Sequence, residues 1–436
     1  MSSRWRVEPV RARPADSDTL RALALVPLIG FAVFSQLDAV ANRLSDGFPV
    51  SLTEIALGGT IAAAGLVLAW PAPGRSQAAA GSLVPRLMLA LFSWALFSWT
   101  LSAHHREGLD YLVKLATAVG PALCLFVIAD RPWHLRALLW AIVAAGAVSA
   151  AIVLVESRTG TRLVSRALAA VTADFEGVAR SAGGSDQNPT TAAQMLLVST
   201  LVAAGWLAAG ARRLRLLLAA AAVLGIVALV MMSARSALLG LIAGLALIAL
   251  FFRRHRAFPL VVAAGLVAGL AAIPFLPPTL IDRFTAIGHF AQDPTLFRRV
   301  TYLRIGADLI AGSPLWGVGP GNFPLYYVTD AYRYLPGREL FPRELHNSYL
   351  DTATEYGLVG FALFAALLVA CARAVRAGMA ADDAGLARMS RAVAVALAGL
   401  LVACFFMPHK DLRYLWLMLA LAAQCGRLRA CREGRP

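Results

Sequence analysis

The chain has 436 residues, of which 59% are hydrophobic and 15% are charged, and its mean hydropathy of +0.68 exceeds that of a soluble globular domain. Apolar runs of roughly 17 to 25 residues, the length that crosses a bilayer, recur from end to end. The formal net charge of +15 comes mainly from arginines in short clusters between these runs, and not from a basic patch or tail. Composition therefore excludes a nucleic-acid partner and predicts one polytopic membrane domain over residues 1–436.

The apolar runs predict an all-α integral membrane protein with about twelve transmembrane helices. These spans centre on residues 20–40, 51–70, 84–103, 109–129, 135–155, 189–209, 214–232, 236–252, 258–276, 348–370, 389–406 and 412–426. The first run lacks a small-residue cleavage site, so we expect a retained span and not a signal peptide. The five cysteines form no C-x-x-C pair, and neither a disulfide framework nor a zinc site is indicated.

Arginine placement predicts the orientation of the spans. If the Arg-rich N-terminus is cytoplasmic, most arginines of alternate connections fall on the same side, as the positive-inside rule requires. These arginines are Arg75, Arg86, Arg131, Arg136, Arg212, Arg213, Arg215, Arg253, Arg254, Arg256, Arg373, Arg376, Arg388 and Arg391. We therefore expect both termini to be cytoplasmic.

The opposite face then holds two substantial loops, at about 157–188 and 277–347. The second loop, between the ninth and tenth spans, is expected to be partly helical. Apolar residues recur at helical spacing over 298–311, and Gly312-Ser313-Pro314 supplies a stop. We expect an amphipathic helix lying on the membrane surface there. The glycine-rich stretch 317–322 that follows predicts either an anion-binding turn or a simple loop.

Three features converge on this face: the loop that runs from 177 through Arg180 to Asn188, the turn at Arg235, and the long loop that ends at His346. A guanidinium offers a planar fork of donors that suits phosphate oxygens, so several arginines around one cavity predict a diphosphate site. An imidazole with a pKa near 6.5 can accept a hydroxyl proton at neutral pH.

The stretch from His346 to Gly360 resembles the H-N-x-x-L-x-x-x-x-E-x-G-x-x-G motif of the O-antigen ligase and polymerase superfamily. It matches at His346, Asn347, Leu350, Glu355, Gly357 and Gly360. The Arg180–Asn188 loop, Ser233-Ala234-Arg235 and Arg299 follow one another in the order expected of that superfamily. The sequence departs from the pattern at Leu303, where a tryptophan is common, and at Asn188, which is one half of a usual asparagine pair.

The resemblance implies a bacterial inner-membrane glycosyltransferase whose active site lies on the periplasmic face. The donor would be an undecaprenyl-diphosphate-linked glycan, and membrane lipids would surround both substrates. In an O-antigen ligase, the activity that the resemblance favours, the acceptor is a sugar of the lipid A core. His346 would be the general base. Arg180, Arg235 and Arg299 would bind the diphosphate, with Asn188, Asn347 and Glu355 in support, and neither metal nor cofactor is required.

Several alternatives stay open. The same superfamily includes O-antigen polymerases and protein O-oligosaccharyltransferases, and a lipid-linked glycan transporter would also suit twelve spans and a cationic cavity. His346 and Arg235 could be interfacial residues, and Glu355 could form a structural ion pair, most simply with an arginine. Asp174 and Glu176 form a weak candidate metal site. His289 and His409 have no motif around them and are expected to be ordinary loop residues.

Overall fold

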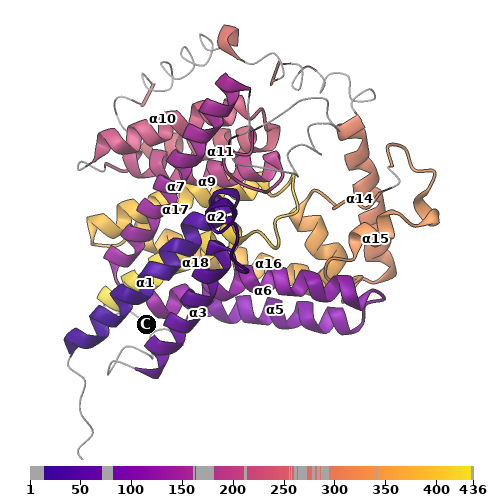
Figure 1. The fold of residues 1–436 in the computed structure, drawn as a ribbon, viewed down its shortest axis with the longest axis horizontal. Coiled ribbons are helices and arrows are strands. Elements are labelled where there is room, and N and C mark those ends of the chain that lie inside the picture. The colour runs from indigo at the N-terminus through magenta and orange to yellow at the C-terminus, as the bar shows by residue number, and fades with distance from the viewer. Residues whose placement is uncertain are drawn as a thin grey trace, which may run out of the picture.

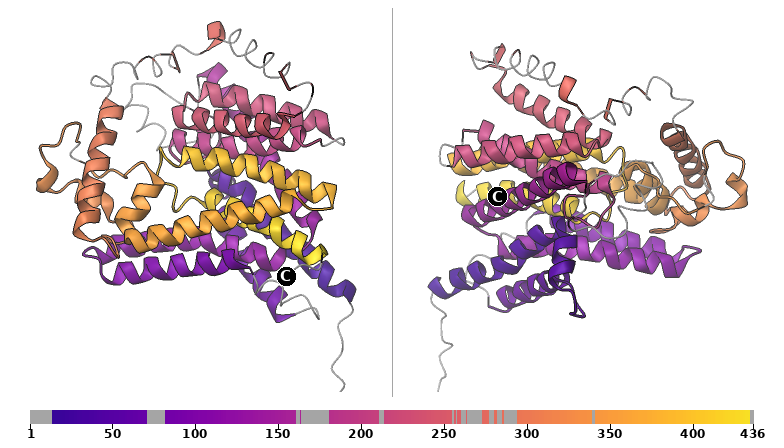
Figure 2. Two further views of the ribbon diagram at one scale, coloured as in Figure 1. Left: turned by 180° about the vertical axis from the view of Figure 1, so that it is seen from behind. Right: turned by 45° about the horizontal axis from the view of Figure 1, so that its top comes forward.

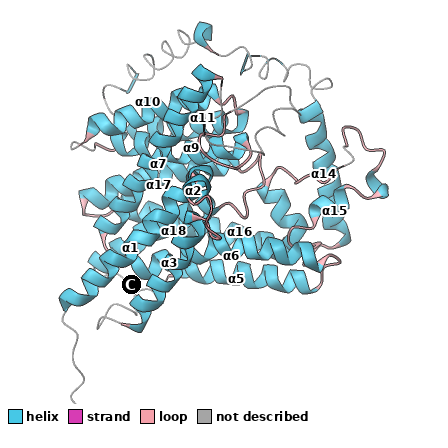
Figure 3. Ribbon diagram, viewed as in Figure 1, coloured by secondary structure: helices cyan, strands magenta, loops and turns pink. Residues whose placement is uncertain are grey.

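The computed structural model is a helical protein. It describes residues 14–70, 82–160, 163, 181–210, 214–254, 256, 258–259, 263, 273–276, 280–281, 285, 294–338 and 341–433. Over these residues no β-strand occurs, as the ribbon coloured by secondary structure shows (Figure 3). The all-α fold predicted from the apolar runs is confirmed.

The long helices form a bundle, with a smaller helical layer across one end (Figures 1 and 2). They are α1 (Pro14–Gln36), α3 (Leu52–Ala69), α5 (Leu83–Thr100), α6 (His105–Ile128), α7 (Pro132–Thr159), α9 (Pro189–Ala208), α10 (Arg215–Met231), α11 (Arg235–Phe252), α14 (Pro294–Gly312), α16 (Ser348–Met379), α17 (Ala384–Ala403) and α18 (Arg413–Glu433). Short elements are α2 (Asp38–Leu44), α15 (Phe323–Tyr327) and the 3₁₀ turns Ile273–Phe275 and Asp330–Tyr332.

Among the described residues, nine helices are long and apolar enough to cross a membrane. The predicted spans coincide with helices except for the one at 258–276, most of which lies outside the described part. The helix α10 is also apolar and, with 17 residues, is one residue shorter than the shortest of these nine. The helix α18 is buried along most of its length, and the buried Gln424 donates a hydrogen bond to the Ala129 carbonyl.

The centre of the bundle is packed through small residues. The helix α9 contacts α7, α10, α11 and α17, and α18 contacts α6, α16 and α17. Where α11 crosses α17, a Cβ on Gly240 would lie 2.6 Å from the Gly399 carbonyl oxygen. Such close backbone approach is the usual basis of helix association in lipid, where apolar burial gives little net drive.

The helical layer at one end of the bundle is organised by α14, which contacts α15 and α16 (Figures 1 and 2). It covers residues 298–311 and ends at Gly312, so the helix predicted there is confirmed, while its position on the membrane surface stays a prediction. Its buried face, with Tyr302 and Ile305, packs in a separate apolar cluster with Phe323 and Leu345. This cluster holds the segment before α16 against α14.

The helix α16 is interrupted at Gly357, whose φ of 68° and ψ of −178° are not helical. The glycine-rich stretch after α14 pairs with the exposed backbone at this break. The amides of Val318 and Gly319 donate to the carbonyls of Thr354 and Glu355, each at 3.0 Å, and Leu358 donates to Pro314 at 2.8 Å. The long loop is therefore fastened to the first third of α16.

Candidate active site

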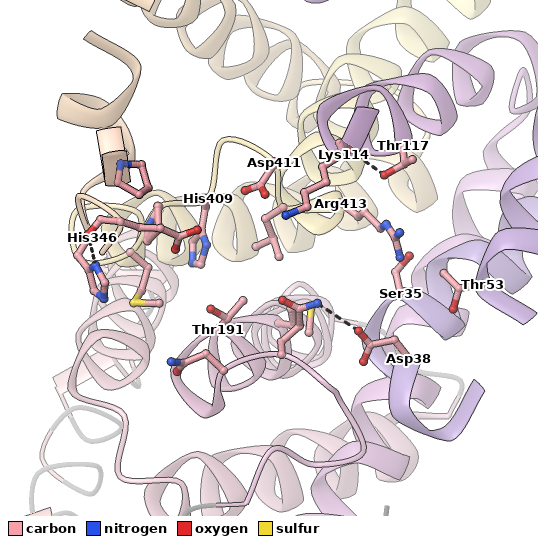
Figure 4. A pocket seen from close by; sticks show the side chains of 18 of the residues that line it. Ser35, Asp38, Thr53, Lys114, Thr117, Thr191, His346, His409, Asp411 and Arg413 are labelled. Atoms are coloured by element: carbon pink, nitrogen blue, oxygen red, sulfur yellow. Dashed lines mark hydrogen bonds between the residues drawn. The ribbon is translucent and has the colours of Figure 1, made fainter. Parts of the chain in front are cut away.

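A polar cavity of about 860 Å³ opens among the ends of α1, α3 and α9, the middle of α6, and the segments that precede α16 and α18 (Figure 4). Most of its wall is made of hydroxyl, amide and charged side chains. The charged and titratable groups are Asp38, Glu54, Lys114, Arg343, Glu344, His346, His409, Asp411 and Arg413. Such a wall suits a ligand that is itself rich in hydroxyl groups and charge.

His346 lies on this wall, two residues before the first residue of α16, with a backbone φ of 55° that side chains seldom adopt. Its Nδ1 is 2.6 Å from the backbone carbonyl oxygen of Glu344. Because a carbonyl oxygen only accepts, Nδ1 carries the proton and Nε2 keeps its lone pair. The ring also stacks on Tyr302, with 5.3 Å between the centroids. The imidazole is therefore held with Nε2 as its basic atom.

The surroundings of His346 favour its neutral form. Burial lowers the pKa of His346 to about 4, and the hydrogen bond to the Glu344 carbonyl opposes this effect. The positive charges of Arg299, Arg343 and Arg298 lower the pKa further. At neutral pH the ring is therefore unprotonated and able to take up a proton.

The start of α16 is pinned to the segment between α17 and α18. Asn347 caps the helix, since its Oδ1 accepts from the amides of Tyr349 at 3.0 Å and Leu350 at 3.1 Å. Ser348 donates from its hydroxyl to the Met407 carbonyl at 2.7 Å and accepts from the His409 amide at 2.8 Å. These contacts fix His346 relative to the opposite segment of the wall.

Glu355 takes part in a buried ionic cluster. Its carboxylate pairs with Lys410, which also pairs with Asp351 at 2.7 Å. The same carboxylate accepts from the backbone amides of Gly321 at 2.5 Å and Phe323 at 3.1 Å. The glycine-rich stretch thus does bind an anion, and the anion is the protein's own Glu355. The structural ion pair expected for Glu355 is present, but its partner is a lysine, not an arginine.

The segment that contains His346, Asn347 and Glu355 is similar to known proteins. Residues 220–365, which include α10, α11, α14, α15 and the first half of α16, match the family model described as O-antigen ligase (Wzy_C). This segment of the chain is therefore similar to the O-antigen ligase family. It is also similar to the exopolysaccharide production protein ExoQ of Rhizobium meliloti (strain 1021), with 30% identity over 115 residues. That match spans 25% of this chain and about a quarter, 26%, of ExoQ.

The arginines that the superfamily motif singled out do not all lie at the cavity. Arg299 is half-buried on α14, with its guanidinium 5.4 Å from the centre of the Phe406 ring, and its charge acts on His346. Arg235 is the first residue of α11 and is not among the described residues that line the cavity. Arg180 lies outside the described residues. Asn188 does line the cavity and caps α9, accepting from the Thr190 amide at 2.8 Å.

Other charged residues of the cavity were missed by sequence reasoning. Lys114, Arg343 and Arg413 line it, although none belongs to the superfamily motif. The composition could have pointed to one of them, because lysine is rare in this chain: Lys114 and Lys410 are its two lysines. One lines the cavity and the other is buried behind it.

His289 and His409, the two histidines without a motif, were both expected to be ordinary loop residues. His409 is not an ordinary loop residue, because it is 1% exposed and lines the cavity. Its burial was not predictable, since it depends on contacts with the distant Ser348. His289 lies outside the described residues, as do Asp174 and Glu176. Within the described part of the chain, no group of three His, Cys, Asp or Glu side chains is arranged to hold a metal ion.

Proposed function

We propose that the protein is a glycosyltransferase that transfers a glycan from undecaprenyl diphosphate to a sugar hydroxyl of the lipid A core, on the periplasmic face of the bacterial inner membrane. The observation that carries this proposal is His346, held neutral on the wall of a polar cavity with Nε2 as its free base. The match of residues 220–365 to the O-antigen ligase family model supports the class of substrate.

In this reaction the acceptor hydroxyl gives its proton to His346 Nε2 while its oxygen attacks the anomeric carbon of the donor. The bond between that carbon and the diphosphate oxygen breaks, and undecaprenyl diphosphate leaves with the bonding electrons. Attack opposite the leaving group inverts the anomeric centre. Nothing in this scheme requires a metal or a cofactor.

Negative charge grows on the diphosphate as it leaves, and guanidinium groups would stabilise it. We assign this role to Arg180, Arg235 and Arg299. Arg299 has the best structural support, because its charge already acts on His346. The assignments of Arg180 and Arg235 rest on the order of the superfamily motif. Asn188, Asn347 and Glu355 would shape the site through the caps and the ion pair described above.

A polymerase of the same superfamily, which would use a second lipid-linked repeat unit as acceptor, is the second candidate. The similarity to a protein named for exopolysaccharide production favours it. Protein O-oligosaccharyltransferase and transporter activities remain outcomes of the test.

The test incubates the purified chain with a diphosphate-linked glycan and, in parallel, with lipid A core, a lipid-linked repeat unit or an acceptor peptide. We expect transfer to lipid A core, no effect of EDTA, and loss of at least about a hundredfold in rate for His346→Ala. Undiminished transfer by that variant would remove the base assignment. Transfer to the repeat unit alone would favour the polymerase. Passage of the lipid-linked glycan across proteoliposomes without transfer would favour a transporter.

A further inference from the structure

A second histidine, His409, lines the cavity that contains His346, and the reaction as written does not use it. His409 lies between α17 and α18, and Figure 4 shows its ring on the cavity wall between His346 and Asp411. The side chain is 1% exposed. A buried polar ring at a substrate cavity calls for an account of its hydrogen bonds.

One nitrogen of the His409 ring is paired and the other is not. The ring is hydrogen-bonded to the backbone carbonyl of Pro408, while Nε2 is buried and has no partner, so the paired nitrogen is Nδ1. A carbonyl oxygen only accepts, so Nδ1 carries the proton. Nε2 is therefore a lone-pair acceptor without a donor, and an acceptor left unpaired at a buried place is costly.

The position of this acceptor relative to His346 is fixed by the fold. The His409 amide donates to the Ser348 hydroxyl at 2.8 Å, and Ser348 is two residues after His346. The next residue, Lys410, is held by the carboxylates of Asp351 and Glu355. The two imidazoles are close enough for the charge on His346 to lower the pKa of His409.

The lone pair on His409 Nε2 determines which kind of group can bind there. A neutral imidazole nitrogen with a lone pair binds a group that donates a hydrogen, and a diphosphate ionised at neutral pH has none to give. A sugar carries several hydroxyl groups on neighbouring carbons. His409 lines the cavity, and a turn about its ring torsion χ2, which has a broad energy minimum, would bring the buried Nε2 to a ligand.

We propose that His409 Nε2 accepts a hydrogen bond from a hydroxyl of the acceptor sugar, next to the hydroxyl that gives its proton to His346. This inference rests on the proposed function and adds a residue that determines acceptor specificity. A site built to pair with a hydroxyl discriminates strongly against an analogue that lacks it. The protein therefore selects acceptors that carry a free hydroxyl beside the reacting one.

Three substitutions separate this role from packing. His409→Gln places an amide oxygen near the Nε2 position, whereas His409→Asn reaches only the Nδ1 position and leaves the acceptor out. His409→Phe keeps the volume of the ring and removes both nitrogens. The purified full-length variants are assayed with the diphosphate-linked glycan as donor and lipid A core oligosaccharide as acceptor. A set of core acceptors, each lacking one hydroxyl beside the reacting position, completes the experiment.

We expect the KM for the acceptor to rise about five- to tenfold in the Asn and Phe variants, the equivalent of one lost hydrogen bond, with the KM for the donor unchanged. The Gln variant should stay near wild type. One deoxy acceptor should be poor for the wild type, yet no poorer than the parent acceptor for the Asn variant.

A KM for the acceptor that is the same in all variants would overturn the proposal, as would equal sensitivity of wild type and Asn variant to every deoxy acceptor. If the Phe variant does not fold, the Asn and Gln pair makes the same comparison. Failure of the proposed function looks different, because the wild type would then transfer glycan to none of the acceptors. If it uses the lipid-linked repeat unit instead, the same comparison is made with that acceptor.

Discussion

His346 combines two properties that usually conflict in a general base. Its pKa of about 4 keeps it unprotonated over the physiological range, but a low pKa also weakens its pull on a proton. The first cause of the low pKa is burial, and substrate binding does not remove it. The developing positive charge on the ring would have to be balanced by the negative charge that grows on the departing diphosphate, so proton transfer and departure are coupled.

The low pKa of His346 predicts the acid limb of the pH profile. A base must be unprotonated to act, so kcat/KM should hold as the pH falls past 6.5 and drop only near pH 4. Replacing Arg299 by Gln removes one positive charge that acts on the ring. The limb should then move to higher pH, by less than about one unit because burial is the larger cause.

The pH profile is read from initial rates with both substrates below their KM, for wild type, Arg299→Gln and Arg304→Gln. Arg304 is an exposed residue of the same helix and serves as the control. A wild-type limb near pH 6.5, or a limb that Arg299→Gln moves to lower pH, would contradict the electrostatic account.

At the scale of single residues, the sequence motif singled out residues of the site but did not predict which residues they contact. The motif singled out six positions of the stretch from His346 to Gly360, and the structure adds that one of them, Asn347, is a helix cap. It did not single out Asp351, which pairs with Lys410. The partner of Glu355 could not be predicted, because Lys410 is 55 residues away along the chain. Pairing over that separation depends on how α16, α17 and α18 pack, which no local pattern encodes.

Among the elements, α16 and the segment before α18 are joined by the buried cluster of Lys410, Asp351 and Glu355. Removing one member of a buried ion pair leaves an uncompensated charge. Lys410→Met should therefore destabilise the protein by about 3–5 kcal/mol, since two buried carboxylates then face each other. Adding Asp351→Asn and Glu355→Gln should recover much of that loss.

The stability of these variants is measured as the thermal unfolding midpoint of detergent-purified protein. Lys114→Met changes the other lysine of the chain, which is exposed, and should leave the midpoint close to wild type. A Lys410→Met midpoint equal to that of Lys114→Met would mean that the cluster contributes little to the fold.

The break in α16 could not be predicted from the pattern of apolar residues. The apolar run predicted a continuous span, but Gly357 has φ and ψ values that essentially only glycine adopts. A Cβ at this position would lie 2.2 Å from the Leu315 carbonyl oxygen. The glycine of the motif is therefore required for the loop after α14 to dock on α16, which in turn brings the amides of Gly321 and Phe323 to Glu355.

Gly357→Ala should consequently cost at least about 2 kcal/mol, from overpacking and backbone strain together, and should reduce transfer as the loop is displaced. Gly65→Ala is the matched control, because that glycine is exposed on α3 and a Cβ there meets no atom within 4 Å. Thermal unfolding and transfer rate are compared for the two variants. Equal behaviour would show that α16 accepts a regular helix at this position.

For the whole molecule, the length of the apolar runs was enough to predict the class of fold. Helices such as α5 and α6 coincide with predicted spans because an apolar run of about 20 residues has few other stable forms in lipid. The cavity could not be predicted in the same way. Its wall is assembled from residues of six or more segments, and Lys114 and Arg413 come from helices that are some 300 residues apart in the sequence.

The arrangement of α18 gives the proposed orientation a direct test. Arg413, the first residue of α18, lines the cavity, while Arg432 near its end pairs with Asp383 at the start of α17. A helix of 21 residues is about 30 Å long, the thickness of the hydrocarbon core, so the two ends of α18 should lie on opposite faces of the membrane. Cys431 is exposed at the far end, and Tyr334 is 91% exposed in the loop on the cavity side.

If the cavity faces the periplasm, a membrane-impermeant maleimide should label Tyr334→Cys, in a Cys431→Ser background, in intact spheroplasts. Cys431 of the wild type should react only after lysis, because α18 places it at the cytoplasmic end. Of the other cysteines, Cys371, Cys404 and Cys425 are buried and contribute little background, and labelling of the half-buried Cys124 is subtracted with a Cys431→Ser control. Labelling of Cys431 before lysis, with Tyr334→Cys protected, would reverse the orientation. It would also place His346 on the cytoplasmic side, where the proposed transfer onto lipid A core at the periplasmic face could not occur.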